Sequence, residues 1–197
     1  MQYAFDFIRD APPFRGRPER VFFALMPDAD EVDRFDCAVQ QFDRLRKTPR
    51  QWLRPDLFHV SLRAVGNGPR GWSRRVAGAQ LVASTIRAPA FDVIFGHIRT
   101  FEPLGSTESR NRPLVLTGES SGLLRLHGAL SMAMGHRGEE TGLAIVPHLT
   151  LAYGGPAVAE RQIEPIRWSV KEFALVHSRR RPWRYEVLGR WPLGVTG

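Results

Sequence analysis

Two histidines in this chain are each followed, two residues later, by a side-chain hydroxyl. His59 and Ser61 stand in the segment FHVSLRAVG, and His148 and Thr150 stand in PHLTLAYGG, so both segments read histidine, aliphatic, hydroxyl, aliphatic. From the composition, about 0.1 matches to this pattern are expected per chain by chance if positions are treated as independent. The duplicated pattern therefore indicates that the two segments share a function.

The spacing places the imidazole and the hydroxyl of each segment on the same face of a β-strand, because residues i and i+2 of a strand point to one side. An imidazole with an ordinary pKa of ~6.5 can act as an acid or a base at neutral pH. Hydroxyls can donate hydrogen bonds to an anion held between them. A single histidine of this kind is more often structural, but two such strands that meet would surround a phosphate with an acid, a base and donors, without a metal.

The elements around the two motifs follow strand and helix periodicities in turn. Helices are expected from Asp28 or Asp30 onward, over about 71–87 and over about 120–135. The first has apolar residues at spacings of three and four, namely Val32, Phe35, Val39, Phe42 and Leu45. Strands are expected in RVFFALMP, FHVSLRAVG, AFDVIFGHIRTFE, RPLVLTG and VPHLTLAYGG. After a connector or short helical piece, RWSVKEFALVHSRRRPWRYEVLGRWPL is expected to form a hairpin with a basic turn.

The order of these elements contains a loose internal repeat. FDVIFGHIRTFE followed by RPLVLTG in the first half corresponds to RWSVKEFALVHSR followed by RYEVLGRWPL in the second half. The repeat predicts that the two histidine strands occupy equivalent positions in two halves of one structure. Residues 1–18 are expected to form an N-terminal arm or loop, and residues 19–197 a single bilobal domain.

The charge balance is basic and consists mostly of arginine. The chain has 28 Lys+Arg against 20 Asp+Glu, a net charge of +8, and only Lys47 and Lys171 are lysines. The planar guanidinium suits phosphate, so this balance fits an RNA or nucleotide partner. A compositional bias of the source genome explains it equally well.

Other classes of protein are excluded or disfavoured. Cys37 is the only cysteine, which excludes an intramolecular disulfide and a multi-cysteine zinc site. No apolar segment approaches the ~20 residues of a membrane span, and the N-terminus lacks the pattern of a secretory signal. We therefore expect a cytoplasmic protein without a membrane partner.

At the two motifs the sequence resembles the two-histidine (2H) phosphoesterase superfamily, and closely its bacterial 2′-5′ RNA ligase branch, also called RNA 2′,3′-cyclic phosphodiesterases. The likeness extends over roughly residues 19 to 193. It implies an α+β fold with two lobes, in which two antiparallel sheets are related by a pseudo-twofold axis, with helices outside and a central cleft. It also implies hydrolysis of a terminal 2′,3′-cyclic phosphate of RNA to a 2′-phosphate, with no metal or other cofactor, by a monomer without a protein partner.

The resemblance also implies roles for individual residues. His59 matches the general acid that protonates the departing 3′ oxygen, and His148 matches the base that activates water. Ser61 and Thr150 match the hydroxyls that hold the non-bridging phosphate oxygens. Tyr153 stands where the branch often has arginine, as in an HLTLAR pattern, and a tyrosine there can stack on a base. Further candidate substrate contacts are Arg63 and Trp183, which stands beside arginines.

Three other functions use the same residues. One is reversible 2′-5′ ligation of RNA, and another is hydrolysis of small cyclic nucleotides. The third, from a different class, is an RNA- or nucleotide-binding module without turnover.

Overall fold

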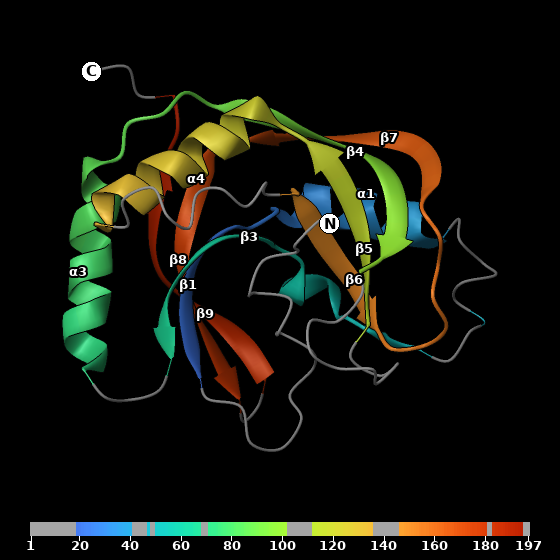
Figure 1. Ribbon diagram of the computed structural model, residues 1–197, viewed down its shortest axis with the longest axis horizontal. Coiled ribbons are helices and arrows are strands. Elements are labelled where there is room, and N and C mark those ends of the chain that lie inside the picture. Colours follow the sequence, from blue (N-terminus) through green and yellow to red (C-terminus); the bar gives the residue numbers. More distant parts are fainter. Residues whose placement is uncertain are drawn as a thin grey trace.

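The computed structural model describes residues 19–40, 47, 50–67, 71–101, 112–135, 146–180 and 183–194. The predicted N-terminal arm, the end of the first predicted helix and the basic turn lie outside these ranges. The described residues form two antiparallel β-sheets and three α-helices (Figure 1). The α+β fold class predicted from the sequence is therefore confirmed.

The first sheet has the strand order β3-β1-β8-β9. Its strands are β1 (Arg20–Leu25), β3 (Val60–Asn67), β8 (Glu172–Arg180) and β9 (Trp183–Pro192). The second sheet has the order β2-β6-β5-β4-β7. Its strands are β2 (Gln51–Trp52), β4 (Phe91–Thr100), β5 (Pro113–Glu119), β6 (His148–Tyr153) and β7 (Arg161–Val170).

The two sheets correspond strand for strand. The order β3-β1-β8-β9 matches β6-β5-β4-β7, and the two-residue β2 is added at the edge beside β6. The histidine strands β3 and β6 thus occupy equivalent positions, as the repeat predicted. The predicted match of RPLVLTG with RYEVLGRWPL was wrong, because β5 corresponds to β1 and β9 corresponds to β7.

The segment before Arg167 was also assigned wrongly. It was expected to be a connector or a short helical piece, and RWSV was expected to belong to the final hairpin. Instead, residues 161–170 form β7, which pairs with β4 in the second sheet, and the hairpin consists of β8 and β9. β7 is an edge strand that is mostly exposed and contains Pro165, so it lacks the apolar alternation by which a strand is recognised.

The three helices begin near the predicted positions, and the second and third also end near them. In α1 (Ala29–Gln40), the amide of Glu31 donates to the Asp28 carboxylate at 2.9 Å, and in α4 (Ser121–Ala133), the amide of Leu123 donates to the Ser120 hydroxyl at 3.2 Å. Both are N-caps of the expected kind. The third helix is α3 (Trp72–Thr85). Among the described residues, no helix is long and apolar enough to cross a membrane.

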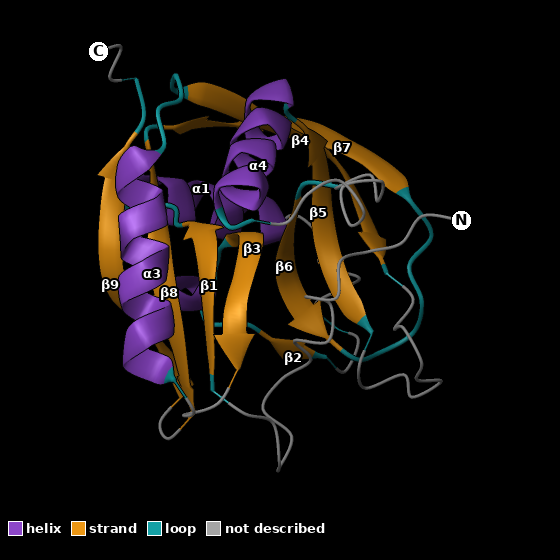
Figure 2. Ribbon diagram, turned by 60° about the vertical axis from the view of Figure 1, so that its left-hand side comes forward, coloured by secondary structure: helices purple, strands orange, loops and turns teal. Residues whose placement is uncertain are grey.

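The helices hold the two sheets together around one main core. α4 contacts β3 of the first sheet and β4 of the second, α3 contacts β3 and β9, and α1 contacts β7 (Figure 2). The core cluster contains buried side chains from both sheets and all three helices, including Phe23, Leu62, Leu126 and Leu149. Two smaller clusters lie apart from it, one around Phe22, Ala24, Ala174 and Val176 and the other around Phe101 and Val115.

Two glycines of α4 give a matched test of how closely this helix packs. A Cβ at Gly122 would lie 2.3 Å from Cβ and Cγ of Phe91, whereas a Cβ at Gly128 would meet nothing within 4 Å. We expect Gly122→Ala to lower the free energy of unfolding by about 1–3 kcal/mol through overpacking. We expect Gly128→Ala to raise it by roughly 0.5–1 kcal/mol, because alanine favours the helix. Urea denaturation would measure both, and equal effects at the two sites would contradict the packing described for α4.

Candidate active site

The two histidine motifs meet although they lie far apart in the sequence. Strands β3 and β6 belong to different sheets and contact each other. His59 directly precedes β3, and His148 is the first residue of β6. His148 also acts electrostatically on His59. The structure therefore brings the two imidazoles into one site, with each histidine half-buried.

Each imidazole is held in the same way. Nδ1 of His59 lies 2.9 Å from the carbonyl oxygen of Leu57, and Nδ1 of His148 lies 2.9 Å from the carbonyl oxygen of Val146. A carbonyl oxygen only accepts, so in both rings Nδ1 carries the hydrogen. In the neutral imidazole, Nε2 then keeps a lone pair available to take up a proton.

The local sequence places both anchoring carbonyls. Leu57 ends the short 3-10 helix η2 (Pro55–Leu57), which begins at a proline, and the Phe58 amide donates to the Pro55 carbonyl at 3.0 Å. On the other side, Pro147 separates Val146 from His148, and its own carbonyl accepts from the Gly118 amide at 3.0 Å. Proline fixes φ near −65°, so the chain enters each histidine strand along a restricted path.

Each motif strand carries a β-bulge at the residue after the hydroxyl. In β3, Ser61 pairs with Ala24 and Arg63 with Phe23, so Leu62 is the extra residue. In β6, Thr150 pairs with Val115 and Ala152 with Leu114, so Leu151 is the extra residue. Both leucines are buried in the main core. Bulges bend a strand and redirect its side chains, and they are frequent beside active sites.

The predicted phosphate-binding hydroxyls lie on the face of their strands opposite the main core. Ser61 is paired with Ala24, and Thr150 with Val115, and these partners belong to the two smaller clusters. Directly paired residues share one face of a sheet. Both hydroxyl residues are half-buried, so they can reach a molecule that occupies the site.

Aromatic rings surround His59. Its ring centroid lies 5.4 Å from that of Phe22 and 5.0 Å from that of Tyr185, which meets it edge-on. Phe22 and Tyr185 also contact each other at 5.8 Å. These three rings form a closed packing arrangement that fixes the plane of the imidazole.

His148 has a different environment. Phe101 lies 5.1 Å from it in an edge-on arrangement, and the guanidinium carbon of Arg99 lies 4.8 Å from the centroid of the Phe101 ring. None of the four residues Phe22, Arg99, Phe101 and Tyr185 was predicted from the sequence to lie at the site. Arg99 and Phe101 have the i, i+2 spacing that places two residues on one face of a strand. This spacing alone does not show that they lie beside a histidine from another segment.

Both histidines are less basic than a free imidazole. Burial lowers the pKa of His59 to about 4; the hydrogen bond to the Leu57 carbonyl acts in the opposite direction, and His148 adds to the lowering. Burial also lowers the pKa of His148, opposed by the hydrogen bond to Val146 and assisted by the charge of Arg99. Desolvation disfavours the charged imidazolium, so both rings are neutral at pH 7 in the free protein.

Two predicted substrate contacts lie elsewhere. Beyond the bulge at Leu62, Arg63 pairs with Phe23, whose side chain is in the main core, and its charge lowers the pKa of His127 on α4. Arg63 therefore faces α4 and not the histidine site. Tyr153 is only 6% exposed and belongs to the main core, so its ring is not available to stack on a base. Contact of Arg63 or Tyr153 with a substrate stays a prediction, which the burial of Tyr153 does not favour.

Trp183 lies one ring away from the site. It is half-buried, and its ring meets that of Tyr185 edge-on at 6.5 Å. Arg54 donates to the Trp183 carbonyl at 3.1 Å. Contact between Trp183 and a substrate stays a prediction.

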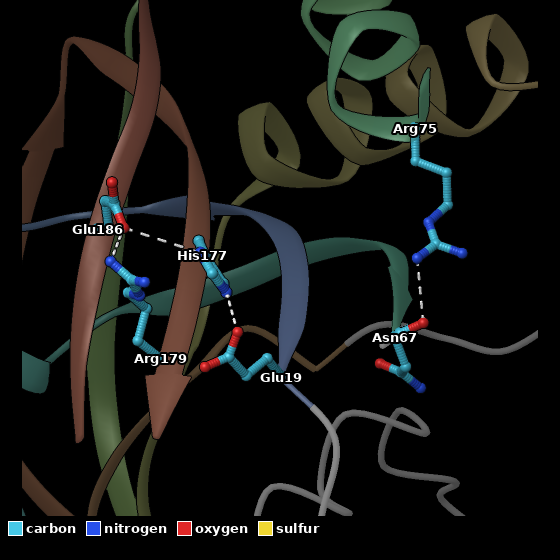
Figure 3. Close-up of polar contacts among 6 residues, drawn as sticks. All are labelled: Glu19, Asn67, Arg75, His177, Arg179 and Glu186. Carbon is cyan, nitrogen blue, oxygen red and sulfur yellow. Dashed lines mark hydrogen bonds and ion pairs between the residues drawn. The ribbon is translucent and has the colours of Figure 1, made fainter. Parts of the chain in front are cut away.

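Another histidine lies in a separate polar cluster at one end of the first sheet (Figure 3). Nε2 of His177 lies 2.9 Å from a carboxylate oxygen of Glu19, and Nδ1 lies 3.8 Å from Glu186, which also pairs with Arg179 at 3.1 Å. His177 is buried and its ring lies 4.2 Å from that of Trp72. Within the described ranges, no group of three or more His, Cys, Asp or Glu side chains is placed to hold a metal.

Comparison with known proteins gives both a family match and similar solved structures. A family model described as the 2′-5′ RNA ligase superfamily matches residues 19–182. TT0787 of Thermus thermophilus is 22% identical, with a TM-score of 0.67, over 90% of this chain and 100% of that protein. E. coli LigT in complex with 3′-AMP is 25% identical, with a TM-score of 0.63, over 90% of this chain and 99% of LigT. The LigT complex with phosphate is 24% identical, with a TM-score of 0.62, over 91% and 100%. Among curated proteins, none matches significantly.

The carbonyl anchors predict a measurable tautomer. In 15N-labelled protein, long-range 1H–15N spectra should show both rings with the hydrogen on Nδ1, because each Nδ1 donates to a carbonyl. The His59 ring should stay neutral until the pH falls to about 4. His59→Gln and His148→Gln variants would assign the signals. A hydrogen on Nε2 of either neutral ring, or a His59 midpoint near the ordinary ~6.5, would contradict this account.

Proposed function

The chain belongs to the 2′-5′ RNA ligase superfamily, and on this premise we propose that it is an RNA 2′,3′-cyclic phosphodiesterase, which opens a terminal cyclic phosphate to a 2′-phosphate. The observation that carries the proposal is the pair of imidazoles with identical Nδ1 anchors, contributed by two strands that contact each other. The nucleotide and phosphate complexes of LigT support the substrate class.

The proposed reaction divides acid and base between the two rings. Nε2 of neutral His148 accepts a proton from water, whose oxygen attacks phosphorus. As the new P–O bond forms, the bond between phosphorus and the 3′ oxygen breaks, and protonated His59 donates its Nε2 hydrogen to that oxygen. The product carries a 2′-phosphate and a 3′-hydroxyl. Exchange of protons with solvent then restores His59 as the acid and His148 as the base.

The lowered pKa values are compatible with this division. A neutral His148 is ready to accept a proton, whereas His59 needs one before it can act as an acid. An anionic phosphate placed between the rings favours the imidazolium form, since an opposite charge nearby raises the pKa of a histidine. Ser61 and Thr150 would donate hydrogen bonds to the non-bridging oxygens, where negative charge grows in the transition state.

The family description itself favours a second candidate, 2′-5′ RNA ligation. In this reaction a 5′-hydroxyl takes the place of water: His148 accepts the hydroxyl proton, and the oxygen attacks the same cyclic phosphate. The acid step at the 3′ oxygen is unchanged. Supplying a 5′-hydroxyl oligonucleotide together with the cyclic-phosphate strand would distinguish ligation from hydrolysis by the length of the product.

Removal of either ring should abolish most of the activity. With an oligoribonucleotide ending in a 2′,3′-cyclic phosphate and EDTA in the buffer, we expect His59→Ala and His148→Ala each to lower kcat/KM by about 10²–10⁴-fold. The double variant should be little worse than the poorer single variant, because the two groups act as a unit. Mass spectrometry and NMR would identify the 2′-phosphate.

His97→Ala is the matched control, because His97 is an exposed histidine of β4 and its loss should leave the rate unchanged. A His148→Ala variant with undiminished activity would reject the assigned base. Tight binding by the wild type without product in single turnovers would indicate a binding module. Comparison with a cyclic mononucleotide would show whether the substrate must be an oligomer.

The lowered pKa values also predict the pH dependence. Turnover needs one ring protonated and the other neutral, and kcat/KM reports the ionisation of the free enzyme. Because the pKa values of both His59 and His148 lie below 6.5, the bell-shaped kcat/KM profile should have its maximum below pH 6.5. The limbs belong to the coupled pair. The kcat profile should lie at higher pH, since bound phosphate stabilises the proton. A kcat/KM maximum above about pH 7 would argue against neutral rings in the free site.

A further inference from the structure

The rows of paired residues that begin at the two motif hydroxyls are similar in the two sheets except at the third position. In the first sheet, Ser61 pairs with Ala24, which in turn pairs with Ala174 of β8. In the second sheet, Thr150 pairs with Val115, which in turn pairs with Arg99 of β4. Because paired residues share a face, each hydroxyl begins a row across three strands. The third residue is alanine in one row and arginine in the other.

The row in the second sheet brings the Arg99 side chain within reach of Thr150. Neighbouring strands lie ~4.8 Å apart, so the backbones of the two residues are separated by roughly 10 Å. Val115 lies between them and is fully buried. An extended arginine side chain can cross a residue of this size, because its guanidinium stands at the end of a three-carbon stem.

Two contacts direct the guanidinium of Arg99. Its carbon lies 4.8 Å from the centroid of the Phe101 ring, and Phe101 itself meets the His148 ring at 5.1 Å. On the other side, a guanidinium nitrogen lies 3.0 Å from a carboxylate oxygen of Glu160, which is 52% exposed. The Arg99 side chain is 20% exposed. The guanidinium is therefore held next to the site but still meets solvent.

Among the described neighbours of His148 on β5, in the other motif and around β4, the charged ones lie on the side of β4. β5 places the uncharged Thr117 opposite it, and the other motif contributes His59. β4 contributes Arg99, with Glu160 behind it. The charge of Arg99 lowers the pKa of His148, which agrees with a short separation between them.

We propose that Arg99 is a substrate-binding residue, which holds a non-bridging oxygen of the phosphate together with Thr150 from the side of the second sheet. This inference rests on the proposed function for the identity of the anion. Guanidinium binds phosphate strongly because it presents several donors in a fixed plane, so one edge can keep Glu160 while another meets the ligand. Tyr153, at the position where the resemblance led us to look for an arginine, is buried in the core. Arg99 supplies a guanidinium from a different strand.

The pairing with Glu160 adds a second element to the proposal. The Glu160 carboxylate competes with phosphate for the same cation, and it is exposed enough for the ion pair to be weak. A bound phosphate would gain part of the interaction that Glu160 now makes. Loss of the carboxylate should therefore strengthen binding of an anion, whereas loss of the guanidinium should weaken it.

Inorganic phosphate is the probe that tests this inference. We would follow its binding by NMR shifts of His148 and Thr150 at pH 7 in the full-length protein. Arg99→Gln should weaken phosphate binding about 10- to 100-fold, the effect of losing a hydrogen bond to a charged group. Arg99→Lys should recover part of the affinity, and Glu160→Gln should tighten binding. Thermal unfolding of each variant would show that it is folded.

Arg161→Gln is the matched control, because Arg161 is an exposed arginine of β7 that pairs with Ile98, next to Arg99. Its loss should leave phosphate binding unchanged. If Arg161→Gln weakened phosphate binding as much as Arg99→Gln, the loss of net positive charge would explain both results, and the inference would be overturned. Equal weakening by Glu160→Gln would also overturn it, since the ion pair would then act only as a support.

The outcomes for Arg99 and for the proposed reaction are separable. If phosphate binding depends on Arg99 but no cyclic phosphate is hydrolysed, the proposed reaction fails and the binding role stands. If hydrolysis occurs and Arg99→Gln changes neither phosphate affinity nor KM, the reaction stands and the role of Arg99 is rejected.

Discussion

A hydrogen bond between the Nδ1 hydrogen of an imidazole and a backbone carbonyl two residues earlier occurs twice in this protein, and the candidate site depends on it. The bond to Leu57 fixes the tautomer and orientation of His59, and the bond to Val146 does the same for His148. The backbone supplies the partner in both cases, so orientation does not need a carboxylate. A carboxylate there would raise the pKa of the ring by its charge, whereas a carbonyl leaves burial as the leading influence and keeps the ring neutral.

Two bulges connect this site to the core. Leu62 and Leu151 are both extra residues in their strands and both buried in the main core. Each bulge follows a hydroxyl residue, so the residues beyond it no longer continue the face on which histidine and hydroxyl stand. The site therefore ends at the bulge in both halves, and the same leucines that end it anchor the strands. A larger or smaller residue in place of either leucine would disturb both the packing of the strand against the core and the position of the hydroxyl residue before the bulge, because interiors are closely packed.

The pseudo-twofold relation between the sheets holds for the backbone but not for the surroundings of the rings. His59 packs between Phe22 and Tyr185, whereas His148 meets Phe101, on which Arg99 stacks. A symmetric pair of imidazoles gives no reason for one to be the acid and the other the base. The unequal neighbours give the two rings different electrostatic surroundings: Arg99 contributes to the lowered pKa of His148, whereas burial is the main cause that lowers the pKa of His59 to about 4.

The sequence by itself determined the motif residues and the three helices, because these follow from spacing and periodicity within single segments, and its resemblance to a known superfamily implied the α+β class. It also placed the histidine strands in equivalent positions. It did not show on which face Arg63 and Tyr153 lie, since a bulge is a property of strand pairing and cannot be read from one strand. It missed β7, whose edge position removes the apolar alternation, and it missed Tyr185 and Arg99, which approach the histidines from other strands. Only the tertiary structure decided which side chains surround each ring, because those contacts join segments that no local pattern connects.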